Sequence, residues 1–189
     1  MSAQDSKLFV ISGPSGAGKG TLVTRVRERR SNLGLTVSAT TRAPRKGEVD
    51  GVNYFFLTRE EFDRRVANGE FVEWAEVHGN CYGTLVSEVT SKLASGASLI
   101  LEIDVQGALQ VKERFPEAVL IFIKPPSLEV LRERLVGRGT ETPETIELRM
   151  ANAAHELALA DRYDDVVVND DLDHATDELA RVLDMHERI

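Results

Sequence analysis

The chain has 189 residues, of which 42% are hydrophobic and 29% are charged. This composition is typical of one globular domain with an apolar core and room for a small inserted lobe. The formal net charge of −8 argues against general nucleic-acid binding, which requires a basic face. A local basic pocket is still possible, because most of the 23 basic residues are arginines, whose planar forks match phosphate oxygens.

The chain has no sequence signal for export or for a membrane. Its one cysteine, Cys81, excludes an internal disulfide. No apolar run approaches the ~18 residues that span a bilayer. The N-terminus lacks the basic and apolar regions of a signal peptide. We therefore expect a cytoplasmic protein without membrane or nucleic-acid partners.

The chain opens with a strand, a glycine-rich turn and a helix. Residues 7–12 form a short apolar run that predicts a buried strand. Residues 21–30 place Leu22, Val23 and Val26 at helical spacing, which predicts an amphipathic helix.

The next stretch, residues 38–84, departs from this rhythm and is interpreted as an inserted lobe. It begins with a polar segment rich in Arg, Lys, Gly and Pro over residues 40–51. Residues 53–57 and 71–78 then favour strands, and residues 59–68 favour a helix.

The alternation of strand and helix resumes over residues 85–189, which with residues 1–37 form the predicted core. Strands that are apolar throughout indicate a parallel sheet covered on both faces, so we predict a three-layer α/β/α fold. Such sheets bind ligands at the carboxyl ends of their strands. The predicted strands are 98–103, 118–123 and 166–168, and the predicted helices are 87–94, 107–114, 128–136, 143–160 and 172–186.

The glycine-rich turn contains the G-x-x-x-x-G-K pattern of a P-loop between a predicted strand and a predicted helix. Its glycines let backbone N–H groups face an anion, and the helix N-terminus adds partial positive charge. Lys19 can reach the β- and γ-phosphates. The predicted ATP phosphate site consists of Gly13, Pro14, Ser15, Gly16, Ala17, Gly18, Lys19, Gly20 and Thr21.

One position of this loop departs from the usual pattern. Gly20 stands where Ser or Thr commonly follows the lysine, and Thr21 comes one residue later. We therefore expect Mg²⁺ to be held mainly by phosphates and water, which suits its reluctance to dehydrate. Glu102 is the candidate that could act on the ion through water.

The short length and the inserted lobe favour a small nucleotide kinase. Six segments make the comparison more specific: Ser38–Glu48, Asp50–Phe56, Phe71–Ala75, Gly79–Thr84, Ile103–Gly107 and Arg134–Arg149. Together they resemble the guanylate kinase family, over most of the chain, with a guanylate-kinase-like domain over residues 5–184.

The resemblance implies transfer of a phosphoryl group from ATP to GMP, giving ADP and GDP, with dGMP as a second acceptor, in purine nucleotide metabolism and GMP recycling. It also implies a lid over residues 134–149.

The resemblance assigns the GMP phosphate to Arg42, Arg45, Tyr54 and Tyr82. Arginines three apart in a polar segment can supply bidentate hydrogen bonds to a dianion, and each tyrosine can donate a hydroxyl. Without the resemblance, the arginine pair also fits a solvated loop, and Tyr54 fits a core position.

The resemblance assigns the guanine base to Glu73, helped by Ser38, Thr84 and Asp104. A carboxylate accepts from both N1–H and the N2 amino group of guanine, whereas adenine presents unmatched lone pairs, so such a site can discriminate strongly. Alone, Glu73 would be a solvent-facing strand residue. Asp104 could instead orient magnesium-bound water, but we favour base recognition.

The lid candidates are Arg134, Arg138 and Arg149, which we place with Lys19 in the catalytic set. Phosphoryl transfer requires alignment and neutralisation of spreading charge, and arginines that approach on closure supply both. Arg134 could instead pair with Glu133 or Glu141. Asn169, just after the last predicted strand, resembles the residue that contacts the adenine of ATP.

Two other functions compete with this interpretation. Guanylate-kinase-like domains in scaffold proteins bind phosphopeptides without catalysis, but they typically lose the loop glycines and lysine, which Gly18 and Lys19 retain here. A kinase acting on a ribosyl phosphate would have no guanine edge to recognise, and Glu73, Tyr82 and Thr84 argue against it.

Overall fold

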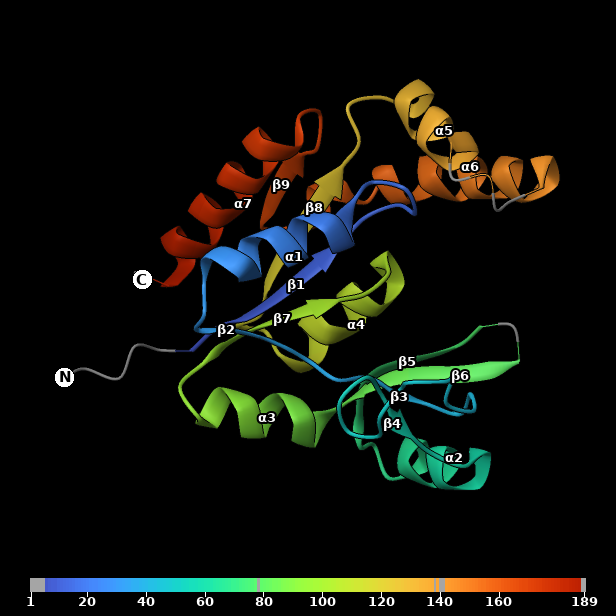
Figure 1. Cartoon of the computed structure of the whole chain (residues 1–189). Helices are drawn as coiled ribbons and strands as arrows, with labels where there is room; N and C mark the ends of the chain where they lie inside the picture. The colour runs from blue at the N-terminus through green and yellow to red at the C-terminus, as the bar shows by residue number, and fades with distance from the viewer. Residues whose placement is uncertain (1–5, 78, 138, 140–141, 188–189) are drawn as a thin grey trace.

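A computed structural model of the chain describes residues 6–77, 79–137, 139 and 142–187. Its main sheet has five parallel strands in the order β2-β7-β1-β8-β9, as Figure 1 shows. This confirms the predicted α/β fold with a parallel sheet. The strands are β1 Leu8–Ser12, β2 Leu33–Leu35, β7 Ser98–Glu102, β8 Val119–Lys124 and β9 Asp165–Val168.

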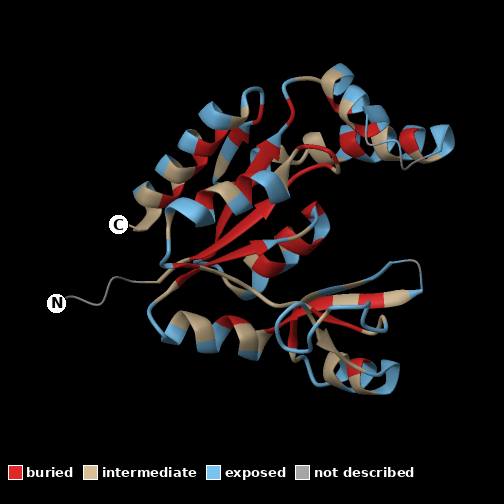
Figure 2. Cartoon of the chain, viewed as in Figure 1, coloured by how far each residue is buried: buried red, intermediate tan, exposed pale blue. Residues whose placement is uncertain are grey.

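Helices cover both faces of this sheet (Figure 1). Alternate residues of β1 enter opposite layers: Phe9 and Ile11 pack with α1 (Lys19–Arg29) and α7 (Leu172–Glu187). Leu8 and Val10 pack with α3 (Val86–Ala94) and α4 (Val105–Arg114). The central strands are therefore buried (Figure 2) except at the last residues of β7 and β8, Glu102 and Lys124, which explains their otherwise apolar sequence.

A second sheet of four strands, in the order β4-β3-β6-β5, lies below the main one in Figure 1. Helix α2 (Arg59–Ala67) packs on it through Phe62, whose ring stacks on Phe71 with centroids 4.3 Å apart. The strands are β3 Ala39–Thr40, β4 Phe55–Phe56, β5 Phe71–Val77 and β6 Asn80–Leu85.

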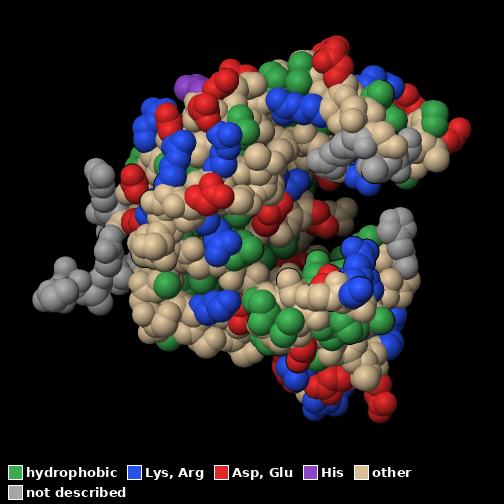
Figure 3. Space-filling model, viewed as in Figure 1, with side chains coloured by type: hydrophobic (Ala, Val, Ile, Leu, Met, Phe, Trp, Pro, Cys, Tyr) green, Lys and Arg blue, Asp and Glu red, His purple; other side chains and the backbone are tan. Residues whose placement is uncertain are grey.

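Helices α5 (Leu128–Gly137) and α6 (Pro143–Leu157) extend from the core as a pair. They share a small apolar cluster that includes Leu131, Leu135 and Ile146. The surface of the molecule is hollowed between this pair and the second sheet (Figure 3). None of the helices in the described ranges is long and apolar enough to cross a membrane.

Several element boundaries differ from the sequence prediction for local reasons. Helix α4 begins at Val105 because the side chain of Asp104 caps it, accepting from the Gly107 N–H at 2.7 Å. Helix α6 ends at Leu157, and a separate 3₁₀ turn follows over Ala160–Arg162. The pattern did not predict β2, β3 or β6, and two of these are only two or three residues long.

Candidate active site

The P-loop connects β1 to α1 at the carboxyl end of the sheet. Gly13 adopts φ 142°, and a Cβ there would lie 2.2 Å from the backbone oxygen of Ile123 in β8, so only glycine fits. The Nζ of Lys19 donates to the backbone oxygens of Gly13 at 2.5 Å and Pro14 at 3.1 Å. The lysine side chain therefore folds back over the loop.

Asn169 anchors the same loop from the end of β9. Its side chain is buried, and its Nδ2 donates to the backbone oxygen of Ala17 at 2.8 Å. A Cβ on Gly18, which has φ 90°, would lie 2.3 Å from that nitrogen. The backbone oxygen of Asn169 accepts from Arg134 Nη2 at 2.8 Å. Asn169 and Arg134 together line a cavity of ≈ 320 Å³ beside the P-loop.

A second cavity, of ≈ 340 Å³, also borders the loop and is lined by Lys19, Gly20, Thr21 and Glu102. A Cβ on Gly20 would lie 3.5 and 3.7 Å from the two Glu102 carboxylate oxygens, which is ordinary contact. Burial raises the pKa of Glu102, and the charge of Lys19 opposes that shift. In the described part of the chain, no group of three or more His, Cys, Asp or Glu residues could hold a metal ion.

Two of the predicted lid arginines approach the P-loop in this structure. Arg149 Nη1 donates to the hydroxyl of Ser15. Arg134 leaves its Nη1 buried without a hydrogen-bond partner among the described residues, at the wall of the cavity that it shares with Asn169. A buried guanidinium nitrogen without an acceptor suits an anionic or polar ligand. Arg138 and Glu141 lie outside the described residues.

An arginine and two tyrosines gather on the second sheet. The Arg42 guanidinium lies 5.4 Å from the Tyr54 ring centroid, and the Tyr54 and Tyr82 centroids are 6.3 Å apart. Arg42 Nη2 also donates to both Glu48 carboxylate oxygens, at 2.8 and 3.0 Å. This contact raises the pKa of Arg42 and lowers the pKa of Glu48.

Glu48 is a residue that the sequence analysis did not single out. It also accepts from the Arg45 backbone N–H at 2.6 Å, while Arg45 itself is exposed. Glu48 therefore holds the Arg42–Arg45 segment in a fixed turn. Its position in the sequence could have indicated this role. Glu48 follows Arg42 by six residues and Arg45 by three, and a carboxylate that close to two arginines can pair with either.

Glu73 and Thr84 face each other across the β5–β6 ladder. Thr84 is buried, and its hydroxyl donates to Glu73 Oε1 at 2.8 Å. Burial raises the pKa of Glu73, Thr84 lowers it, and the charge of Asp104 raises it further. Glu73 is therefore no solvent-facing strand residue, because it lies in a partly desolvated pocket with Thr84 and Asp104 beside it.

The remaining predicted residue of this pocket, Ser38, lies at the entrance to the second sheet. It is half-buried, and its backbone oxygen accepts from the Phe55 N–H at 2.9 Å. The structure thus brings Glu73 and Thr84 together and gathers Arg42, Tyr54 and Tyr82 on the same sheet. The P-loop belongs to the main sheet, which Figure 1 shows apart from the second sheet.

Comparison with known proteins gives one consistent result. The guanylate kinase family model matches residues 5–186. A guanylate kinase of Gloeobacter violaceus is 57% identical over 178 residues, covering 94% of this chain and 87% of the relative. One from Halalkalibacterium halodurans is 52% identical over 183 residues, covering 97% and 90%. The crystal structure of guanylate kinase from Anaplasma phagocytophilum superimposes with a TM-score of 0.74 at 36% identity, covering 97% of this chain and 87% of that one.

Proposed function

Because the chain belongs to the guanylate kinase family, we propose that it transfers the γ-phosphoryl group of ATP to GMP, giving ADP and GDP, with dGMP as a second acceptor. The observation that carries this proposal is the desolvated Glu73 carboxylate, paired with Thr84, together with an intact P-loop. The loop supports phosphate binding, and the carboxylate supports recognition of guanine.

In this account the P-loop holds ATP. The loop between β1 and α1 lies at the N-terminus of α1, where free backbone N–H groups and the partial positive charge of the helix would bind the phosphates of ATP. Lys19 exchanges its contacts to the Gly13 and Pro14 backbone oxygens for phosphate oxygens, which are stronger acceptors. The cavity between Arg134 and Asn169 is the proposed adenine site.

The cavity at Gly20 fits the Mg²⁺ ion that accompanies ATP. Its donors are hard oxygens, the Glu102 carboxylate and the Thr21 hydroxyl, beside the Lys19 cation. Glu102 would act through water, while phosphate oxygens supply the direct ligands. When bound, Mg²⁺ neutralises charge on the β- and γ-phosphates.

The second sheet, within residues 38–84, is the proposed GMP-binding lobe. Arg42, Arg45, Tyr54 and Tyr82 bind the phosphate dianion, for which Glu48 holds the arginine segment ready. Glu73 accepts from N1–H and the N2 amino group of guanine, and Thr84 fixes one of its oxygens. Ser38 and Asp104 complete the base pocket.

Transfer then requires alignment rather than an added base, because the attacking oxygen of GMP is already anionic. Lys19, Arg134, Arg138 and Arg149 neutralise the charge that spreads over the transferred group. Residues 134–149 act as a lid that excludes water, which would otherwise accept the phosphoryl group. The hydrogen bond from Arg149 to the Ser15 hydroxyl in the P-loop supports this role for Arg149.

The test is chromatographic detection of ADP and GDP after mixing protein, ATP, GMP and Mg²⁺. We expect both products in equal amounts, and Lys19→Ala should reduce turnover by at least roughly 100-fold, since it removes the transition-state cation. Its thermal melt should stay close to that of the wild type. ADP without GDP would indicate hydrolysis instead, and no product at all would favour a binding module.

A further inference from the structure

The first residues of β5 join the second sheet to the core. Phe71 packs inside the second sheet's apolar cluster with Phe62 and Leu85. Its neighbour Val72 packs in the main core with residues of α4 such as Ala108. Consecutive side chains therefore belong to two different cores. The contacts of this segment therefore set the orientation of the second sheet relative to α4.

Three successive backbone oxygens, from Gly69 to the first residue of β5, Phe71, accept hydrogen bonds from the core. Arg114, the last residue of α4, donates from Nη1 to the Phe71 oxygen at 2.8 Å and from Nη2 to the Gly69 oxygen. The oxygen between them, that of Glu70, accepts from the Val86 N–H at 2.9 Å. One side chain thus supplies two of the three bonds.

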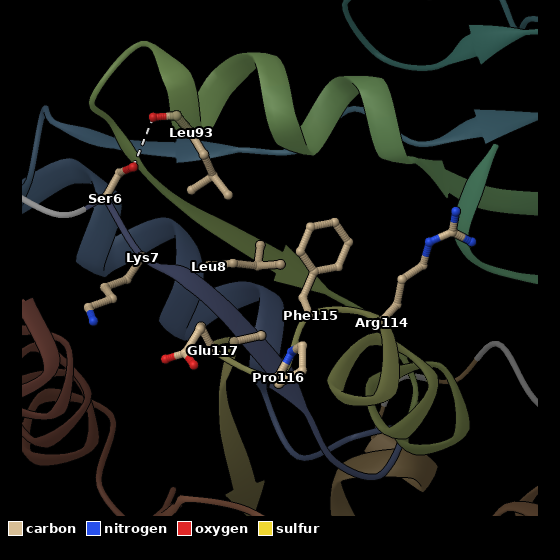
Figure 4. Close-up of a pocket in the computed structure, with 9 residues that line it drawn as sticks. Ser6, Lys7, Leu8, Leu93, Arg114, Phe115, Pro116 and Glu117 are labelled. Atoms are coloured by element: carbon tan, nitrogen blue, oxygen red, sulfur yellow. Dashed lines mark hydrogen bonds between the residues drawn. The ribbon is translucent and has the colours of Figure 1, made fainter. Parts of the chain in front are cut away.

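Arg114 is directed at the second sheet and away from the core. It borders a cavity of ≈ 450 Å³ with Leu8, Leu93 and Phe115. In Figure 4 its guanidinium extends away from the other labelled side chains of that cavity, toward the neighbouring strand. Its planar fork reaches two carbonyl oxygens at once, which a lysine cannot do with the same geometry.

The segment that Arg114 holds leads directly to the base-recognising carboxylate. The pairing of β5 with β6 shifts register between Phe71 and Glu73, so the ladder alone does not fix this stretch. Glu73 Oε2 would lie 3.4 Å from a Cβ on Gly107 in the first turn of α4. Helix α4 therefore contacts β5 at both ends, at Gly107 beside Glu73 and at Arg114 beside Phe71.

We propose that Arg114 is a positioning residue for guanine recognition: by fixing the Gly69–Phe71 backbone to α4, it sets the direction in which β5 presents Glu73. The inference rests on the proposed function, since it concerns how the base pocket is oriented. Arg114 does not touch substrate in this account. Its loss leaves the P-loop and the ATP cavity intact.

The test compares Arg114→Gln with Lys112→Gln, which removes another cation from the last turns of α4. Lys112 bonds to the Ala118 oxygen and to Asp164, both within the core, so it is a matched structural control. For Arg114→Gln we expect the KM for GMP to rise about 10-fold, in line with two lost hydrogen bonds. The KM for ATP and the kcat at saturating GMP should stay within about 2-fold. Lys112→Gln should leave all three unchanged.

Two further measurements separate positioning from simple stability. The preference for GMP over inosine monophosphate, which lacks the 2-amino group, should fall in Arg114→Gln and recover in part in Arg114→Lys. In a Glu73→Gln background, Arg114→Gln should change the KM for GMP far less, because the two residues act as one unit. Equal effects in both backgrounds, or a lower melting temperature with unchanged GMP kinetics, would overturn the inference.

Failure of the proposed function would look different from failure of this inference. If the wild type forms no GDP from GMP, the proposed function itself fails. If the wild type is active and the Arg114 and Glu73 effects are additive, only the positioning role fails. Should Arg114→Gln not fold, Arg114→Lys carries the same comparison, with a smaller expected rise in KM.

Discussion

At the scale of single residues, the charge on Glu73 is under opposing influences. Burial and the neighbouring Asp104 disfavour its ionised form, and the Thr84 hydroxyl favours it. An ionised carboxylate in a partly dry pocket is costly unless hydrogen-bond donors satisfy it. The proposed ligand, guanine, has two N–H donors that would satisfy the Glu73 carboxylate. The desolvation cost of this carboxylate thus favours binding of a ligand with that donor pattern.

This balance predicts that GMP binding weakens in mildly acidic solution. Protonated Glu73 can no longer accept from both guanine donors, and its raised pKa places the loss at a higher pH than an ordinary glutamate would. Calorimetric titration with GMP measures this loss of affinity when it is repeated at decreasing pH, from pH 7.5 down over roughly three pH units. Glu73→Gln supplies the control, because the pH dependence that remains in this variant comes from other groups, including the GMP phosphate. Identical pH profiles for the two proteins would contradict the assignment.

At the scale of elements, the P-loop helix is fastened to the last helix by a row of ion pairs. Arginines of α1 and its C-terminal end face carboxylates spaced along one side of α7. Because α1 begins at the phosphate cradle, this contact supports the site from behind. The pairs are Arg25–Asp173, Arg29–Asp177, Arg30–Asp184 and Arg30–Glu187.

These pairs should differ strongly in their contributions to stability. The Arg30 side chain is 13% exposed and its partner Glu187 6%, whereas Arg25 and Asp173 are 38% and 79% exposed. Arg30→Gln leaves buried carboxylate charge behind and should lower the free energy of unfolding by about 2 kcal/mol. Arg25→Gln should cost less than about 1 kcal/mol. Urea unfolding checks both values. Equal losses would show that burial does not control these pairs.

The sequence predicts some elements well because their signals are local. The P-loop is one continuous segment between a strand and a helix, and the structure places both as expected. Strands β2 and β3 are too short to show a period, and their pairing partners lie far away in the chain. The burial of Glu73 likewise depends on β6 and α4, which no pattern within β5 reveals. Resemblance to a family supplied that residue's role.

At the scale of the whole molecule, a hollow separates the α5–α6 pair from the second sheet (Figure 3), and the two proposed nucleotide sites are on the P-loop and on the second sheet. The proposed transfer requires the GMP phosphate to reach the γ-phosphate in line, so we expect the proposed lobe and lid to approach each other. We expect small-angle scattering to show a decrease in the radius of gyration, from about 16 Å for a compact chain of this length, with GMP and a non-hydrolysable ATP analogue together. The analogue alone should produce a smaller change. An unchanged radius with both ligands would contradict closure.

The central claim is that this chain selects guanine through Glu73 and phosphorylates the nucleotide so selected. A coupled ADP-release assay with GMP, AMP, CMP and UMP tests it most directly. We predict a kcat/KM for GMP on the order of 10⁴-fold above that for AMP. Glu73→Gln should reduce that ratio by roughly 10- to 100-fold, since a charge-assisted hydrogen bond is lost. Equal rates with GMP and AMP in the wild type would contradict the claim.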